Sequence, residues 1–419
     1  MNIPSGQRSA KFTTLLISSF TAVMALSACE VRINGDELKG SGKITTEVRT
    51  VTAFDSINNA TPFDVIITAE GAVGVSVVGD DNLLSEIETT VEENTLVIRN
   101  KRKGGFHTSW NHTPLTVKVT MPVMNKLHNT GSGDIRLFKL HGDKLAITSD
   151  GSGDIQASGT VSEANVIING SGDLDLAQLH TGKLTLLQNG SGDAHLSSIT
   201  QSLEVEMNGS GDLEAESLQI ERATVKIHGP GSATLNGVIK SLTAELSASG
   251  DMFIDRLQAD QANITMQGSG EVRLVGEVKQ LTATVSGSGD LDAEGLQVGG
   301  AVIKNSGSSN ISSGTISGSL KAEFSGSGDL TAKFKSADQI DANMNGPGSL
   351  TLEGSAKNLS ALLNGSGDLH ATSLLLEHAS VKVTGPGEAE VNVKSASNDK
   401  ASTSSGSRVV KVDRTGVVQ

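Results

Sequence analysis

Gly131-Ser132-Gly133-Asp134 is the first of fourteen closely related four-residue phrases, and the last is Gly385-Pro386-Gly387-Glu388. Successive phrases are spaced alternately by 20 and 19 residues throughout this stretch. A repeat period near 20 residues is typical of a solenoid, in which each repeat buries its apolar edge only against its neighbours. We therefore expect one elongated body, despite the length of 419 residues.

The fourth residue of the phrase divides the repeats into two sets related by 39 residues. Aspartate occupies this position in all seven members of the first set, whereas the second set varies. The ancestral unit is therefore predicted to be two coils long. The first set is Asp134, Asp173, Asp212, Asp251, Asp290, Asp329 and Asp368, and the second is Asp154, Asp193, Ser232, Glu271, Asn310, Ser349 and Glu388.

Apolar residues between the phrases recur at steps of two. After Asp212 they begin at Leu213 and Ala215 and resume from Ala223 to Ile227. Steps of two are typical of strands with one face inward. The predicted fold is all-β, a parallel β-helix of about 14–15 coils of 19 or 20 residues. In the 19-residue coils we expect the missing residue just before the last apolar run.

The phrase itself is expected to form a tight corner. Proline replaces its serine at Pro230, Pro347 and Pro386. Proline followed by glycine is typical of a type II turn, with glycine at the position that needs a positive φ. Because proline has no N–H, the serine N–H is predicted to stay outside the strand ladder. The aspartate after the turn is predicted to bond nearby backbone N–H groups.

Residues 1–28 are predicted to be a signal peptide. Arg8 and Lys11 precede an apolar run from Phe12 to Leu26 that is too short for a transmembrane helix. The sequence Leu26-Ser27-Ala28-Cys29 resembles a bacterial lipoprotein signal, which implies that Cys29 is acylated. Cys29 is the only cysteine, so no disulfide can form. The alternative is an ordinary signal peptide with an incidental cysteine.

The charge of the chain argues against a nucleic-acid partner. The formal net charge is −14, and removing residues 1–28, with two basic residues and no acid, gives −16. Nucleic-acid binding needs a basic surface. Aromatic residues are only 2% of the chain, which suits a narrow interior of stacked aliphatic rows.

Alternating segments before the repeats predict a β cap. They include Val51-Thr-Ala-Phe54-Asp-Ser-Ile57, Phe63-Asp-Val65, Val77-Val-Gly79-Asp-Asp-Asn82-Leu83-Leu84 and Thr95-Leu96-Val-Ile98. Together with the phrases, these segments resemble the putative auto-transporter adhesin, head GIN domain family, over about residues 45–394. The resemblance implies a right-handed parallel β-helix in a lipoprotein or secreted protein, and no established biochemical function. The array is longer than the family pattern and its C-terminus is weaker.

These observations predict five segments. Residues 404–407, Ser-Ser-Gly-Ser, lie in phase as an eroded fifteenth phrase, Arg408 to Val412 are a candidate closing strand, and the polar residues 395–403 are expected to be mobile. The segments are a signal peptide (1–28), a tether (29–45), an N-terminal β cap (46–130), the β-helix repeats (131–394) and a polar tail (395–419).

Two ligand-binding interpretations compete with a structural role for the phrase. A phosphate-binding loop would open a helix after a strand, but each phrase is followed by alternating apolar residues, so no nucleotide cofactor is expected. Calcium-binding β-rolls repeat every nine residues, which differs from the spacing here. Carboxylates in a row could still collect hard cations, so a calcium-binding repeat protein remains an alternative.

Catalysis is the third alternative, because parallel β-helices also host polysaccharide lyases and hydrolases. Three adjacent carboxylates, or an arginine–carboxylate pair in one groove, would favour an enzyme, whereas uniform Ser, Thr, Asn and Lys faces would favour binding. The repeats show no irregular constellation. An unusual cluster in the cap is His107, Trp110 and His112, and the other histidines fall at different offsets (His141, His180, His195, His228, His370 and His378).

The function predicted from the sequence is that of a non-catalytic, lipid-anchored β-helical scaffold with adhesin-like binding faces. Its partners would be the membrane, through the anchor, and an unidentified surface glycan or protein. Glu30 follows Cys29 where retention in the inner membrane typically has aspartate, so by resemblance to lipoprotein sorting the outer membrane is expected. The runner-up is a polysaccharide-active enzyme on the same scaffold.

Overall fold

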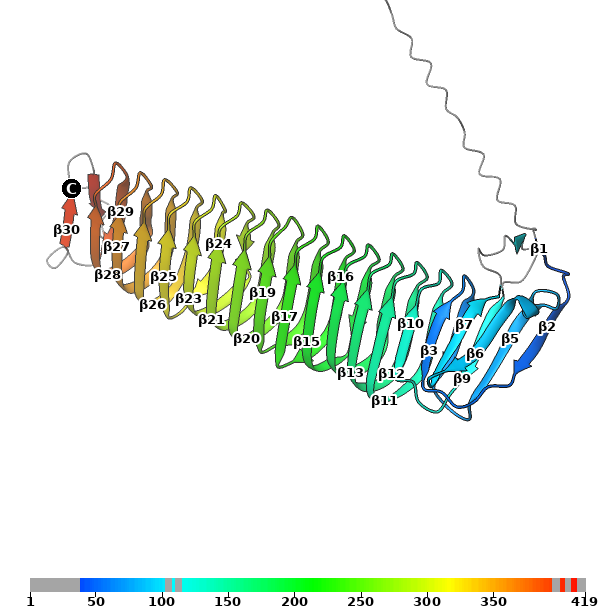
Figure 1. The fold of residues 1–419 in the computed structure, drawn as a ribbon. Helices are drawn as coiled ribbons and strands as arrows, with labels where there is room; N and C mark the ends of the chain where they lie inside the picture. The colour runs from blue at the N-terminus through cyan, green and yellow to red at the C-terminus, as the bar shows by residue number, and fades with distance from the viewer. Residues whose placement is uncertain (1–37, 102–107, 110–114, 394–399, 404–407, 413–419) are drawn as a thin grey trace, which may run out of the picture.

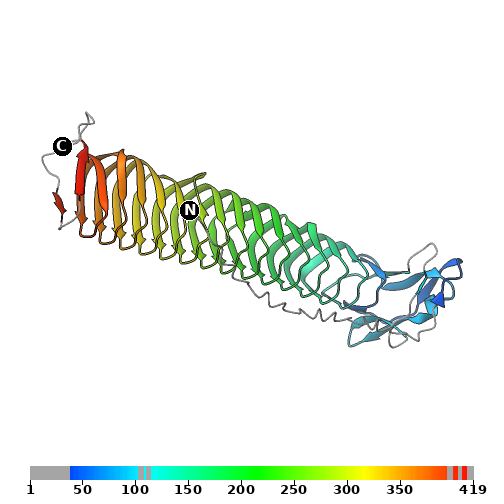
Figure 2. The same cartoon turned by 90° about the horizontal axis from the view of Figure 1, so that it is seen from above.

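The computed structural model describes residues 38–101, 108–109, 115–393, 400–403 and 408–412. These residues form a long rod, with the N-terminal strands at one end and the C-terminal strands at the other (Figures 1 and 2). The rod is a parallel β-solenoid of about 13 turns, which confirms the predicted fold class. The turns are fewer than the expected 14–15 because fourteen corners enclose thirteen coils, and residues 404–407 lie outside the described ranges.

Each coil consists of three segments whose side chains alternate between core and solvent. In one coil the chain runs through β16 (Leu213–Ile220), turns, and continues through β17 (Arg222–Ile227). We call the outward surfaces of residues 213–215, 218–220 and 222–227, with their counterparts in other coils, the first, middle and third faces. Inward residues such as Leu213 and Val225 join one continuous aliphatic core. Parallel pairing to both neighbours satisfies the backbone groups.

The coil strands are stacked in chain order, apart from a few coils that are divided into two strands. They are β10 (Lys126–Asn129), β11 (Ile135–Ser149), β12 (Ile155–Ile168), β13 (Leu174–Gln188), β14 (Ala194–Ser197), β15 (Ile199–Met207), β16, β17, β18 (Ala233–Ile239), β19 (Ser241–Leu246), β20 (Met252–Met266), β21 (Val272–Val285), β22 (Leu291–Asp292), β23 (Leu296–Asn305), β24 (Ile311–Ile316), β25 (Ser319–Phe324), β26 (Leu330–Met344), β27 (Leu350–Leu363), β28 (Leu369–Val383) and β29 (Glu388–Val393).

The difference between 20- and 19-residue coils is absorbed at the bend between the first and middle faces. The register between β11 and β12 shifts between Leu137 and Leu140, and two further coil pairs shift at the same place. The expectation that the missing residue precedes the last apolar run is therefore wrong for these pairs. In the shorter coil Gly237 takes the bend with φ +142°, and a Cβ there would lie 2.3 Å from the Leu218 carbonyl oxygen.

The N-terminal strands close the first coil, although part of this region already has coil geometry. β3 (Ser56–Ala60) and β4 (Asp64–Thr68) pair in parallel with β10 and β11. Outside them lie β7 (Thr95–Asn100) and β9 (Thr116–Thr120), also parallel to β3 and β4. The antiparallel strands are β2 (Ile44–Arg49) on β5 (Gly74–Asp80), β5 on β9, and β6 (Ile87–Glu92) on β7; the remaining elements here are η1 (Leu84–Glu86), β1 (Leu38–Lys39) and β8 (Thr108–Ser109).

The C-terminal strands extend the stack beyond the last full phrase. β30 (Lys400–Thr403) pairs in parallel with β28, so this part of the segment expected to be mobile is strand. β31 (Arg408–Val412) pairs in parallel with β29, at the place proposed for a closing strand. Both strands continue the parallel register of the coils.

Candidate functional site

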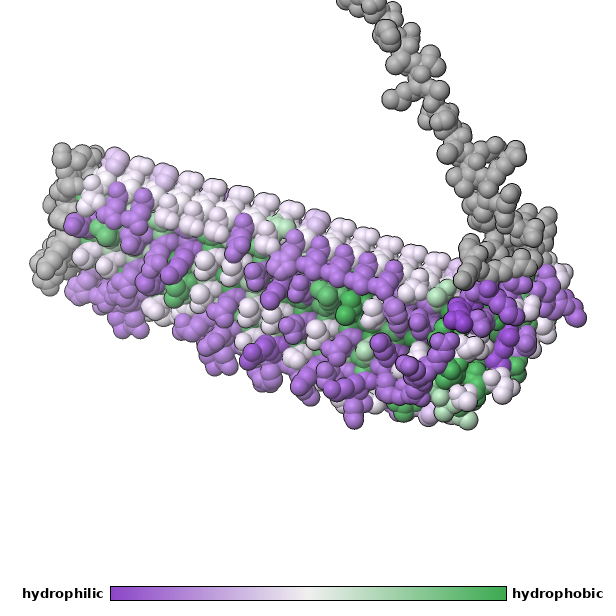
Figure 3. Space-filling view, in the orientation of Figure 1, coloured by the Kyte–Doolittle hydropathy of each residue, from purple (hydrophilic) through white to green (hydrophobic). Residues whose placement is uncertain are grey.

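The corners line up along one edge of the rod. The second phrase residue is exposed in successive coils, as at Ser152, Ser171 and Ser191, while the glycine after it is buried. In Figure 1 these corners form the upper edge of the rod, which Figure 3 shows as a row of pale, weakly polar residues. The phrase therefore builds a narrow ridge of serine hydroxyl groups and backbone.

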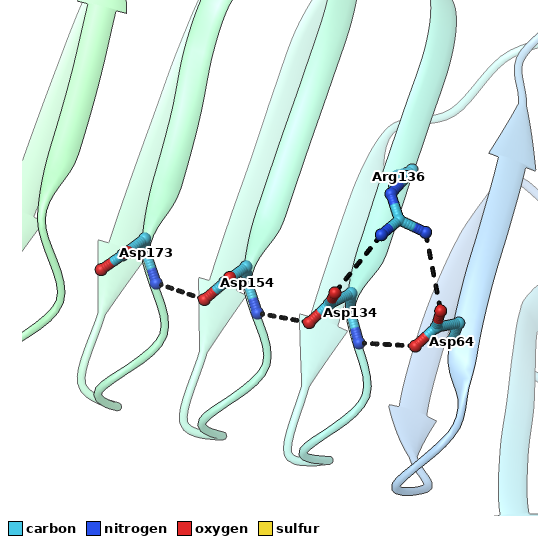
Figure 4. A network of polar contacts seen from close by, with 5 residues as sticks. All are labelled: Asp64, Asp134, Arg136, Asp154 and Asp173. Carbon is cyan, nitrogen blue, oxygen red and sulfur yellow. Dashed lines mark hydrogen bonds and ion pairs between the residues drawn. The ribbon is translucent and has the colours of Figure 1, made fainter. Parts of the chain in front are cut away.

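The aspartates of the phrase form a hydrogen-bonded ladder, which we call the aspartate ladder. In each step a carboxylate oxygen, Oδ1, accepts the backbone N–H of the fourth phrase residue in the next coil (Figure 4). The N···O distance is 3.3 Å from Asp154 to Asp134 and 2.9 Å from Asp173 to Asp154. The partner is thus in the neighbouring coil, which sequence reasoning about a local turn did not anticipate.

The geometry of Asp154 explains why a side chain is needed in the ladder. Its carbonyl accepts the N–H of Ile135 in the preceding coil at 2.8 Å. Its own N–H faces the same coil, where the corner places Asp134 Oδ1 instead of a backbone acceptor. This bond lies at an exposed position, where a hydrogen bond contributes about 0.5–1.5 kcal/mol net. The carboxylate therefore completes the ladder at the point where the backbone turns away.

The ladder accounts for the two-coil period. All seven first-set aspartates accept the N–H of the following coil, including Asp251 from Glu271, Asp290 from Asn310 and Asp368 from Glu388 at 2.7–2.8 Å. In the second set, only the two aspartates do the same, toward the coils of Asp173 and Asp212. One short carboxylate every two coils is therefore the constant element of the repeat.

The first rung of the ladder lies in the cap and was missed from the sequence. Asp64 Oδ1 accepts the N–H of Asp134 at 3.3 Å, across 70 residues. Arg136 contacts Oδ2 of Asp64 at 3.6 Å and of Asp134 at 3.4 Å (Figure 4). The corner is Thr61-Pro62-Phe63-Asp64, and its proline and aspartate match the phrase. This match with the phrase could have been noticed in the sequence. The corner has no glycine, however, and its aspartate lies 70 residues before that of the first phrase instead of about 20.

The phrase glycines are required by close approach and not by a positive φ. A Cβ on Gly190 would lie 1.6 Å from the carbonyl oxygen of Gly170, and one on Gly172 would lie 2.2 Å from that of Gly153. None of the phrase glycines in the described coils has a positive φ. The predicted type II turn is therefore wrong, and stacked corners need glycine because each packs against the corner before it.

The serine N–H of the phrase joins the hydrogen bonding between coils at four corners. Ser269, Ser288, Ser308 and Ser327 donate to the carbonyl of the first phrase residue in the preceding coil at 3.0–3.1 Å. The prediction that this N–H is unused is wrong for those four corners. They follow Ala248, which replaces the first glycine, and they include none of the three prolines. Proline thus occurs only at corners outside this run.

Asparagines preceding the phrase form a second, shorter ladder beside the corner. Asn189 donates to Asn169 at 2.7 Å, and Asn208 donates to Asn189 at 2.8 Å. Asn169 in turn donates to Asp150, and this bond, with a second contact from His128, holds the pKa of the Asp150 carboxyl below its usual value. Side-chain ladders therefore support both sides of the corner.

The other predicted site residues do not converge on one centre. His141 and His180 lie two coils apart, since both register with Thr160. Among the described residues, no group of three or more histidine, cysteine, aspartate or glutamate side chains could hold a metal ion. Cys29 and the cluster of His107, Trp110 and His112 lie outside the described residues.

The first face carries a depression with adjacent carboxylates. Asp173, Asp193 and Asp212 line it along one side, together with His195 and Glu214. Adjacent carboxylates were the pattern expected of an enzyme. Each of the three aspartates, however, already holds a backbone N–H through Oδ1, and so do the two aspartates bridged by Arg136.

A groove follows the middle face, and we call it the middle-face groove. It consists of three adjoining depressions of about 480, 630 and 340 Å³. Ser217 and Gln219 line both the first and the second, and Gln258, Glu277 and Gln297 line both the second and the third. It runs from the coil of Thr160 to that of Ser317, which is about 40 Å at the spacing of strands in a sheet.

A row of alternating charges follows one side of the coils and supplies a wall of the third depression through Asp260 and Lys279. Lys240 contacts Glu221 at 2.6 Å, and Lys279 contacts Asp260 at 2.6 Å. The hydrogen bond from Lys279 holds the pKa of Asp260 below its usual value, and the bond to Glu221 raises the pKa of Lys240. The row stops at Gly299, where a Cβ would lie 2.5 Å from the Lys279 carbonyl oxygen. The charge row is therefore interrupted here, while the coils continue in parallel register through β23.

The comparisons with known proteins identify the family. The model of the putative auto-transporter adhesin, head GIN domain family matches residues 53–198, 160–256, 246–333 and 301–412. The chain belongs to this family. Its corner ladder and stacked glycines are thus features of a head GIN domain protein. No protein of curated function matches the chain.

Several solved structures resemble the chain distantly. A putative adhesin from Bacteroides fragilis NCTC 9343 shares 18% identity, with 80% of this chain and 99% of that one covered and a TM-score of 0.25. A putative lipid binding protein from Parabacteroides distasonis ATCC 8503 shares 18% identity over 76% and 100% of the two chains, with a TM-score of 0.21. A putative adhesin from Parabacteroides merdae ATCC 43184 shares 13% identity over 90% and 100%, with a TM-score of 0.25.

Substitution of the ladder aspartates separates hydrogen bonding from charge. Asn at Asp251, Asp290 and Asp329 keeps an acceptor oxygen for the next coil, so stability should change little. Ala removes the acceptor and should cost about 1 kcal/mol per site. Chemical denaturation of the two triple variants measures the difference, and equal stability of both would contradict the ladder.

The same Asn variants test the calcium alternative. We expect cation binding to be weak. It should concentrate in the run from Asp134 to Asp212, because acids in adjacent coils repel one another there by roughly 1 kcal/mol in water and a cation would relieve that repulsion. Calorimetric titration should therefore show no stoichiometric, micromolar calcium sites. Several such sites in the parent, whether or not the Asn variants lose them, would place the protein among calcium-binding proteins.

Proposed function

We propose that this protein is a non-catalytic, lipid-anchored scaffold of the cell envelope that binds a ligand along its long faces, as an adhesin does. The observation that carries the proposal is the middle-face groove, whose outward polar groups extend over many coils without serving the fold. Membership of an adhesin family supports a location at the cell surface or in the envelope. The described residues include no helix with the length and apolar character needed to cross a membrane.

A binding screen tests this function. The soluble 30–419 fragment is applied to envelope fractions and to a panel of glycans, and specific, saturable retention is expected. Absence of retention on every fraction and glycan would contradict a binding role.

The anchor is proposed to be Cys29, the single cysteine of the chain. Cys29→Ala should release the protein from the membrane fraction, because no other thiol can be acylated. Fractionation measures the release from the membrane, and a metabolic acyl label measures the loss of acylation. Acyl label still incorporated in the variant would end the lipoprotein proposal, and Ser27→Ala serves as the control that should keep the anchor.

A polysaccharide-active enzyme remains the second candidate. The observation that favours it is the row of Asp173, Asp193 and Asp212 in the depression of the first face. Acid–base catalysis needs two carboxyl groups whose surroundings separate their roles. Here successive aspartates have the same partner and geometry, so the row is better explained by the ladder.

A further inference from the structure

The middle-face groove carries a periodic set of uncommitted amide groups. Gln219, Gln258 and Gln297 follow one another at intervals of 39 residues, which is two coils. Their side chains are exposed, and among the described residues none hydrogen-bonds to another protein group. Strand spacing places successive amides about 9.6 Å apart along the rod axis. This period repeats the two-coil unit of the ladder on a different face.

The positions between the glutamines are also outward. Val238 registers with Gln219, and Glu277 registers with both Gln258 and Gln297. Thr315 continues the row after Gln297. The floor of the groove is thus a line of hydrogen-bonding groups, interrupted by one aliphatic residue.

The walls give the groove little net charge. On the bend side lie Glu216 and Arg256, and on the opposite side Asp260 pairs with Lys279. With Glu277 on the floor, the lining carries three acidic and two basic side chains, so the groove presents no strong charge of one sign to a ligand. An uncharged or weakly charged chain fits these walls better than a strongly anionic one.

We propose that the middle-face groove binds an extended β-1,4-linked glycan, running parallel to the rod axis. An amide offers both donors and an acceptor, as sugar hydroxyl groups do. A β-1,4-linked chain is straight and repeats every two sugars over a length close to two coils, so equivalent hydroxyls meet successive glutamines. This inference rests on the proposed binding function and names its site and ligand class.

An extended peptide fits the groove less well. On the middle face Gln219 pairs with β18 and Gln258 with β21, and every coil of the groove has another coil stacked on each side, so no open sheet edge is available for an added strand. The floor also lacks the side-chain pockets by which extended peptides are selected. Since no phenylalanine, tyrosine or tryptophan side chain lines the groove, each sugar contributes little, and affinity should depend on chain length.

Oligosaccharide titration of the full chain tests the proposal. The probes are N-acetylglucosamine oligomers of two to six sugars, cellohexaose, and the α-linked maltohexaose as a geometric control. We expect affinity to rise with length and to be greatest for a β-1,4-linked hexamer. Preference for the acetylated oligomer would indicate cell-wall glycan as the source, and preference for cellohexaose would indicate a glucan from outside the cell.

Two double variants locate the site. Gln258→Ala with Gln297→Ala removes two amides of the groove, and should weaken hexamer binding by about tenfold, the loss of two modest hydrogen bonds. Gln261→Ala with Gln267→Ala changes two exposed glutamines outside the groove and should bind as the parent does. Equal affinity of the groove variant and the parent, or equal binding of maltohexaose, would overturn the proposal.

The result also separates this inference from the function on which it rests. No binding of either β-1,4-linked hexamer at millimolar concentration, with envelope retention intact, would refute the glycan groove and leave the binding function standing. Absence of both hexamer binding and envelope retention would refute the glycan groove and the binding function together. Binding of a peptide or protein from the envelope at the groove glutamines would replace the glycan with another ligand class.

Discussion

Deleting residues 213–251 should leave a folded and shorter rod. The deletion joins Asp212 to Met252, which registers with Ala233 and through it with Leu213, so a buried residue replaces its equivalent. Asp212 Oδ1, which now accepts the N–H of Ser232, would accept that of Glu271 instead. Because each coil contacts only its neighbours, removal of two coils costs only their own share of stability.

A deletion of 30 residues from the same start should abolish folding of the array. Removing 213–242 joins Asp212 to Thr243, which is exposed, at a position that belongs to buried Leu213. Every later side chain in that coil then faces the wrong way. Circular dichroism and limited proteolysis compare the two variants. Equal tolerance of both deletions would show that the repeat register is wrong.

Gly190→Ala should be among the most destabilising single substitutions in the rod. The added Cβ would lie 1.6 Å from the carbonyl oxygen of Gly170, and neither backbone can move without disturbing the next corner. We expect a loss of about 3 kcal/mol, at the upper end of overpacking costs. Ser191→Ala, at the exposed neighbour in the same corner, is the matched control and should have little effect.

Thermal or chemical unfolding measures this difference. Ala248 shows that one corner has accommodated a Cβ, and in the four corners that follow it the serine N–H carries the bond. Gly190 lies before this change, where the glycine N–H donates to Ile168 at 3.2 Å. Stability of Gly190→Ala close to that of the parent would contradict the role assigned to close approach.

The solenoid could be predicted from the sequence because its rules are local. The phrase period sets the coil length, and apolar steps of two set the inward face, as at Leu213 and Ala215. The corner could not be derived in the same way. Its glycines pack against the preceding corner, and its aspartates accept an N–H of the next coil. A model of the turn alone contains neither contact and therefore explained these residues wrongly.

The candidate site also depended on contacts between coils. Asp64 escaped notice because its coil partner is 70 residues away. The glutamines of the groove have no chemistry that marks them in the sequence, since exposed glutamine is common on any surface. Their 39-residue spacing was visible, but only the stacked coils show that Gln258 and Gln297 share one groove.

The most direct test of the central claim is a combined binding and turnover measurement on polymer. The purified protein is incubated with immobilised β-1,4-linked glycan and with envelope polysaccharide, and retained protein, new reducing ends and unsaturated sugar ends are measured together. A non-catalytic scaffold should be retained while releasing no product over days. Product that accumulates in proportion to protein, and disappears with Asp193→Asn, would contradict the account and identify an enzyme on the first face.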